Sequence, residues 1–90
     1  ASVDLSMLLA DGVAWSALIG ALDAEPVPHL QGVRLVDEYR GASLGSATRS
    51  LTIRLELSDA ERTLTASDKA RARETVASRL GALTGVTIRE

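Results

Sequence analysis

The chain has 90 residues, of which 46% are hydrophobic, enough for one small domain with a single core. Only 2% of the residues are aromatic and Phe is absent, so Leu, Val, Ile and Ala must fill that core. The formal charge of −2 argues against a nucleic-acid-binding protein that relies on a net positive field. The absence of cysteine excludes disulfides, thiolate metal ligands and a cysteine nucleophile.

The chain carries no signal for a membrane or for secretion. No apolar stretch approaches the roughly 18 residues of a transmembrane helix, and no basic segment precedes an apolar one at the N-terminus. We therefore expect no membrane contact, and the lack of cysteine fits a reducing compartment. Because the first residue is Ala1 rather than Met, we expect residues 1–90 to be one domain of a longer chain.

The first half of the chain predicts a strand, a helix and a second strand. Apolar residues alternate with polar ones over 3–10, which is typical of a half-buried strand. A helix is predicted over 13–22, with Asp11 as its N-cap and two prolines after it. A second strand is predicted over 32–39. The apolar stripe of the helix consists of Trp15, Leu18, Ile19 and Leu22, which we expect to be buried.

The second half predicts two strands separated by a helix. Leu and Ile alternate with polar residues over 50–57, which indicates a strand with one wet face. Thr65 and Asp68 resemble a capping box, so a helix should begin there and run to about residue 83. A last strand is predicted over 86–89. The residues that this helix should bury are Val76, Ala77, Leu80 and Leu83.

The order strand, helix, strand, strand, helix, strand predicts the fold class. Two such halves form an α+β, ferredoxin-like βαββαβ architecture, in which a four-stranded antiparallel sheet carries both helices on one face. The other face of the sheet is left open. The alternation over 50–57 predicts that this open face is polar.

Catalytic chemistry finds little support in the sequence. The single histidine, His29, lies in a loop directly after Pro28, and no serine stands in a nucleophile-elbow motif. No glycine-rich phosphate loop and no cluster of metal ligands is present.

Base stacking on an open sheet face needs aromatic side chains. Trp15 is expected in the core, and Tyr39 either caps the core or stacks on a base.

Several short stretches, taken in order, resemble one known family, the ferredoxin-fold anticodon-binding (FDX-ACB) domain. They match the motifs of its second strand, its third strand, the entry to its second helix and its last strand. The matching residues are Val36-Asp37-Glu38-Tyr39-Arg40-Gly41, Thr48-Arg49-Ser50-Leu51-Thr52-Ile53-Arg54-Leu55, Arg62-Thr63-Leu64-Thr65 and Ile88-Arg89. Asp4 stands where the family has the Asp of its first-strand motif.

This resemblance implies a function. FDX-ACB domains close the β subunit of bacterial phenylalanyl-tRNA synthetase, a phenylalanine–tRNA ligase, and the single-chain mitochondrial form of the enzyme, and they contact the anticodon stem-loop of tRNA(Phe). We expect the β subunit as the parent chain and a cytoplasmic location. The expected partners are therefore that stem-loop and the rest of the β subunit with the α subunit, without DNA. The domain itself would be non-catalytic and need no cofactor, since ATP and Mg belong to the rest of the enzyme.

The resemblance also implies which residues contact tRNA. Arg54 and Ser50 should share the open face, and Arg40 and Arg49 flank a loop of small residues at 41–47. Arg62 and Thr63 match the family as well, but we expect Arg62 to anchor its turn to an acid, either Asp37 or Asp59. The predicted tRNA-binding residues are Arg40, Arg49, Ser50, Arg54 and Tyr39.

Two alternatives remain open at this point. The acidic pI near 5.3 and the scarcity of aromatic residues also suit a ferredoxin-like protein–protein interaction or regulatory module, whose open face docks another domain. A small enzyme of acylphosphatase-like fold is less favoured, because no Arg/Asn phosphate loop lies near the first strand.

Overall fold

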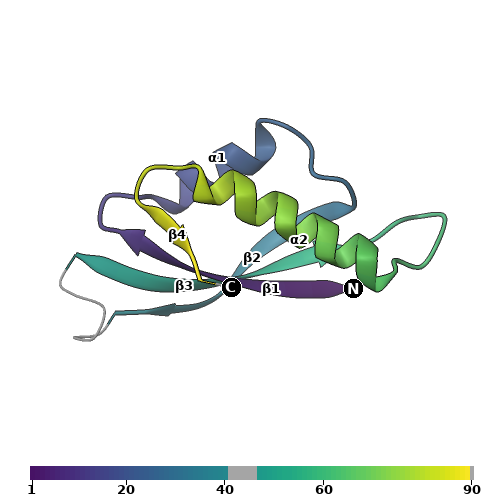
Figure 1. Ribbon diagram of the computed structural model, residues 1–90, viewed down its shortest axis with the longest axis horizontal. Helices are drawn as coiled ribbons and strands as arrows, with labels where there is room; N and C mark the ends of the chain where they lie inside the picture. Colours follow the sequence, from purple (N-terminus) through teal and green to yellow (C-terminus); the bar gives the residue numbers. More distant parts are fainter. Residues whose placement is uncertain (41–46, 90) are drawn as a thin grey trace.

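A computed structural model describes residues 1–40 and 47–89 of the chain. Within these residues the chain forms four strands and two helices in the predicted βαββαβ order, with both helices on one side of the sheet (Figure 1). The elements are β1 (Ser2–Ala10), α1 (Trp15–Asp23), β2 (Leu30–Tyr39), β3 (Thr48–Leu57), α2 (Ala66–Gly81) and β4 (Val86–Ile88). The α+β ferredoxin-like fold is thus confirmed.

The sheet is antiparallel throughout, in the strand order β2-β3-β1-β4. β1 lies at the centre and pairs with β3 from Ser2 to Ala10 and with the short β4 from Met7 to Leu9. β2 pairs with β3 and shifts register twice, once after Leu30 and once after Leu35. These pairings determine which side chains stand next to one another on each face.

The core lies between the sheet and the helices and is entirely aliphatic apart from Met7. The alternation predicted for β1 and β3 is confirmed, because every second side chain of both strands enters this core. Leu55 and Leu9 are completely buried. The buried residues of the two strands are Leu5, Met7, Leu9, Leu51, Ile53, Leu55 and Leu57.

The start of α2 follows the prediction closely. The Thr65 hydroxyl accepts a hydrogen bond from the Asp68 amide at 3.1 Å, and the Asp68 carboxylate accepts one from the Thr65 amide at 2.9 Å. This capping box satisfies two amides that the helix itself leaves unpaired. The helix ends at Gly81, two residues earlier than predicted. Its buried residues are Ala72, Val76 and Leu80, while Ala77 and Leu83 are only half-buried.

The start of α1 differs from the prediction in two respects. Its N-cap is Ala14, which makes no side-chain hydrogen bond, and Asp11 instead forms an ion pair with Arg40. The prediction that Trp15 is buried was also wrong, because its side chain is 37% exposed. Trp15 is the first residue of a nine-residue helix, one turn before Leu18 and two turns before Leu22, which do reach the core.

The outer half of β2 is also more exposed than predicted. Leu35 lies opposite Ile53 on the helix side of the sheet, yet it is 43% exposed. The physical reason is the length of α1, since nine helical residues extend only about 13 Å. The helix therefore covers only the first part of β2, where Ile19 and Leu22 line a small cleft with Val33.

Candidate functional site

The open face of the sheet is formed by rows of side chains that cross neighbouring strands. Directly paired residues on antiparallel strands project to the same face, so the register alone defines each row. We number the rows along β1 from the one that contains Asp4; the row before it contains Glu56, paired with Ser2. The first row contains Arg34, Arg54 and Asp4; the second contains Asp37, Thr52 and Ser6; the third contains Tyr39, Ser50 and Leu8. The predicted polar character of this face is confirmed.

Arg54 is held in place within the first row. Its Nε and Nη2 donate hydrogen bonds to the two carboxylate oxygens of Asp4, at 2.9 and 3.2 Å. These hydrogen bonds lower the pKa of Asp4 and raise the pKa of Arg54, so both groups are ionised at neutral pH. Asp4 therefore orients the guanidinium through one edge, and the Nη1 edge stays available to a ligand.

Tyr39 and Ser50 lie together in the third row. Tyr39 is 53% exposed, so its ring is not part of the core, and it stands directly opposite Ser50. The Ser50 hydroxyl accepts a long hydrogen bond of 3.4 Å from Arg89 Nη1. Arg89 follows β4, and its amide donates to the Ser6 carbonyl at 3.0 Å. The row therefore offers an aromatic ring, a hydroxyl and a guanidinium to one ligand.

Sequence reasoning did not include Arg89 among the site residues. The signal was present in the alternation of the last strand, where Val86 and Ile88 were predicted to face inward. The next residue must then face outward. The structure confirms that Val86 is buried, while Ile88 is half-buried.

The other two predicted site residues, Arg40 and Arg49, lie away from these rows. Arg49 Nη2 donates to the Val13 carbonyl at 2.7 Å, and its Nε lies 2.9 Å from Glu38 Oε2 in an ion pair that is not an aligned hydrogen bond. Only 12% of the Arg49 side chain is exposed. Arg40 Nη1 lies 2.9 Å from Asp11 Oδ1 and is more exposed. Residues 41–46 of the loop that these arginines flank lie outside the described residues.

Arg62 makes contacts that stabilise the entry to α2. Its Nη1 and Nη2 donate to the Asp68 carboxylate at 2.5 and 3.3 Å, and its Nε lies 3.9 Å from Asp59. Hydrogen bonds from Arg62 and from the Thr65 amide hold the pKa of Asp68 well below its ordinary value of 3.8. The expected anchoring of this turn is confirmed, with Asp68 as the main partner; Asp37, the other acid considered, lies on the open face.

His29 belongs to the same end of the molecule. Its Nδ1 lies 3.4 Å from Asp59 Oδ2, and its backbone has a positive φ of 70°. The His29 carbonyl accepts a hydrogen bond from the Ser58 amide. These contacts join the α1–β2 connection to the β3–α2 connection.

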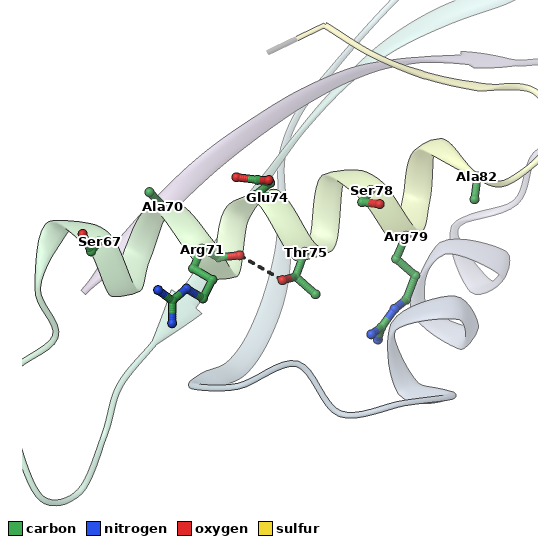
Figure 2. Close-up of a pocket in the computed structure, with 8 residues that line it drawn as sticks. All are labelled: Ser67, Ala70, Arg71, Glu74, Thr75, Ser78, Arg79 and Ala82. Carbon is green, nitrogen blue, oxygen red and sulfur yellow. Dashed lines mark hydrogen bonds between the residues drawn. The ribbon is translucent and has the colours of Figure 1, made fainter.

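Apart from the open face of the sheet, a groove follows the outer side of α2, and Figure 2 shows the side chains that line it. This groove has a volume of about 750 Å³, and two of its polar side chains, Thr75 and Arg79, are engaged within the fold. The Thr75 hydroxyl donates to the Arg71 carbonyl at 2.9 Å, and Arg79 donates to the Glu25 carbonyl and carboxylate. The groove is lined by Ser67, Ala70, Arg71, Glu74, Thr75, Ser78, Arg79 and Ala82.

Residues 1–40 and 47–89 contain neither a metal-ligand cluster nor a membrane-spanning helix. In that part of the chain no group of three His, Asp or Glu residues lies close enough to hold a metal ion. Neither of the two helices found there is long and apolar enough to cross a membrane.

Comparison with known proteins assigns the chain to a protein family. Residues 1–89 match the ferredoxin-fold anticodon binding domain family. The chain is 38% identical over its whole length to the phenylalanine–tRNA ligase β subunit of Leifsonia xyli subsp. xyli, of which it covers 11%. Over 65 residues it is 38% identical to that subunit from Xanthomonas campestris pv. campestris and 35% identical to that from Thiobacillus denitrificans. Those stretches are 72% of this chain and 8% of each relative.

Proposed function

The chain belongs to the ferredoxin-fold anticodon binding domain family, and from this membership we propose that it binds the anticodon stem-loop of tRNA(Phe). The observation that carries the proposal is the match over residues 1–89 together with relatives that are phenylalanine–tRNA ligase β subunits. The domain would orient tRNA(Phe) for aminoacylation performed elsewhere in the enzyme. Its partners would be the rest of the β subunit and the α subunit, in the cytoplasm, and ATP and Mg would act at a distant site.

The open face supports this proposal chemically. Tyr39 offers a ring on which an unpaired base can stack, and such stacking is tolerant of base identity. Ser50, beside it, offers a hydroxyl to a base edge or a sugar. Arg54 offers a guanidinium that suits a phosphate or a guanine edge. Loop nucleotides of RNA present these groups, whereas a regular RNA helix hides its base edges.

The contacts predicted for Arg40 and Arg49 stay predictions. Both guanidiniums already pair with acids, so RNA would have to displace Asp11 or Glu38 to reach them. Arg40, with 55% of its side chain exposed, is the easier of the two to recruit.

Steady-state aminoacylation by the full-length enzyme tests the proposal. Tyr39→Ala should raise the KM for tRNA(Phe) about tenfold or more, because loss of base stacking costs about 1–3 kcal/mol. The rate of phenylalanine activation, which needs no tRNA, should not change. Arg71→Ala removes a charge from the outer side of α2 and serves as the control. Unchanged tRNA kinetics after deletion of the whole domain would refute the proposal.

A protein–protein docking function is a second candidate, and one observation favours it. Trp15 and Leu35 are exposed apolar side chains on the helix side of the sheet, at 37% and 43%. We propose that this side contacts the rest of the β subunit. The double variant Trp15→Ala, Leu35→Ala would then weaken assembly of the enzyme and leave RNA binding by a correctly folded chain intact. Normal assembly of that variant would dismiss this function.

A further inference from the structure

The first row of the open face brings two arginines together. Arg34 on β2 and Arg54 on β3 are direct cross-strand partners, so their side chains project from the same face of the sheet. Directly opposed residues have Cβ atoms about 4.5–5.5 Å apart, and like charges in this position destabilise a sheet. The pair of like charges therefore destabilises the sheet unless neighbouring groups offset the repulsion.

Only part of this charge is balanced within the molecule. Asp4 engages the Nε and Nη2 of Arg54, as described above. Across residues 1–40 and 47–89, the guanidinium of Arg34 makes no hydrogen bond or ion pair. Asp4 thus pairs with Arg54 alone, and within the described residues the guanidinium donors of Arg34 and the Nη1 group of Arg54 are unused.

The rest of the open face limits what kind of anion fits. Glu56 lies in the row before the first, Asp37 lies in the second row, and Arg89 lies toward the third, so these acids together with Asp4 balance the three arginines among the described residues. A diffuse positive field cannot gather a polyanion here. A single compact anion can still bind between two adjacent guanidinium forks, because such forks pair with phosphate at short range.

We propose that Arg34 and Arg54 jointly bind one phosphate of the tRNA backbone, while Tyr39 stacks on a base of another nucleotide in the same strand. The proposal rests on the proposed function and adds Arg34 to its site. Arg54 and Ser50 are four residues apart on β3, which is about 13 Å. Tyr39 stands opposite Ser50, so the phosphate and the stacked base belong to different nucleotides. Asp4 is a positioning residue that fixes Arg54 in the orientation the phosphate needs.

The test compares the salt dependence of tRNA(Phe) binding by the full-length enzyme and four variants: Arg34→Ala, Arg54→Ala, the double variant and the Arg71→Ala control. Each phosphate contact on single-stranded RNA contributes about 0.7 to the slope of log K against log salt. Each single variant should lower the affinity about tenfold and the slope by about 0.7. Because both arginines hold the same phosphate, the double variant should also lose about 0.7 rather than twice that amount.

Other outcomes would overturn the proposal in different ways. If Arg34→Ala matches the Arg71→Ala control while Arg54→Ala is impaired, Arg34 has no part in the site, although the proposed function stands. A slope loss of about 1.4 in the double variant, with multiplicative affinity losses, would mean two separate phosphates. If tRNA binding is the same with and without the whole domain, the proposed function fails together with this inference.

Discussion

The two faces of the sheet are made by the same strands, yet different forces act on them. On the helix side, alternate residues of β1 and β3 are aliphatic and almost fully buried, as Leu55 and Ile53 illustrate. On the open side, their neighbours form short polar contacts, such as the 3.0 Å hydrogen bond between the Ser6 and Thr52 hydroxyls. Burial of apolar surface stabilises a fold much more than exposed polar pairs do.

This difference explains how so small a domain can keep one face for a ligand. The helix side supplies the stability, so residues on the open side can be chosen for binding. The opposed pair of Arg34 and Arg54 is an example, because it is unfavourable for the sheet but suited to an anion. Predictions that compare the two sides test this division of roles.

The largest expected effect lies on the helix side. Leu55→Ala should lower the free energy of unfolding by about 3 kcal/mol, because it leaves a cavity in a fully buried site. Thr52→Ala, on the open side of the same strand, should cost less than about 1 kcal/mol through its lost hydrogen bond. Urea denaturation of the chain measures both. Equal losses would show that the open side stabilises the fold as much as the core.

A smaller effect should distinguish Arg49, near the start of β3, from Arg40, which directly follows β2. Arg49→Ala should cost about 2 kcal/mol, since it removes a largely buried guanidinium from the Val13 carbonyl and the Glu38 carboxylate. Arg40→Ala removes an exposed ion pair and should cost less than about 1 kcal/mol. Thermal and urea unfolding of both variants provide the comparison. If Arg49→Ala leaves the free energy of unfolding unchanged, the Arg49 side chain does not stabilise the fold and is free to bind RNA.

The parts of the fold that were predictable from sequence are those set by local periodicity. Alternation over residues 50–57 identified both the buried and the open side of β3, because a strand repeats every two residues. The capping box of Thr65 and Asp68 was predictable for the same reason, since its partners are three residues apart. Arg54 and Ser50 were therefore correctly assigned to the open face.

What the sequence could not predict depends on distant elements. Periodicity indicates the side on which Trp15 and Leu35 lie, but not that α1 is too short to cover them. The role of Arg49 depends on the backbone of Val13, which is 36 residues away. The opposition of Arg34 and Arg54 requires the register of a hairpin with two irregularities, and no local pattern specifies it.

The helix layer offers a comparison of its own, between the capped α2 and the uncapped α1. Thr65→Ala removes the hydroxyl that caps α2 and should lower the free energy of unfolding by about 1 kcal/mol. Ser67→Ala, inside the first turn, is the matched control and should stay within about 0.5 kcal/mol. Urea denaturation again gives the values. A loss in the control as large as that in Thr65→Ala would contradict the role of the cap.

The smallest expected change in the free energy of unfolding follows from lowering the pH, because acid protonates carboxylates on the exposed surface and leaves the apolar core unchanged. The pKa values of Asp4 and Asp68 lie below 3.8 in the folded chain, since Arg54 and Arg62 donate hydrogen bonds to them. Their stabilising contribution is therefore complete above about pH 4 and is lost as the pH falls through the lowered pKa. Urea denaturation between about pH 5 and pH 2 should show this loss. Asp68→Asn should remove more of it than Asp4→Asn, because Asp68 also accepts a hydrogen bond from Thr65. Leu55→Ala should give a pH profile parallel to the wild type, because no titrating group is among the buried residues of 1–40 and 47–89.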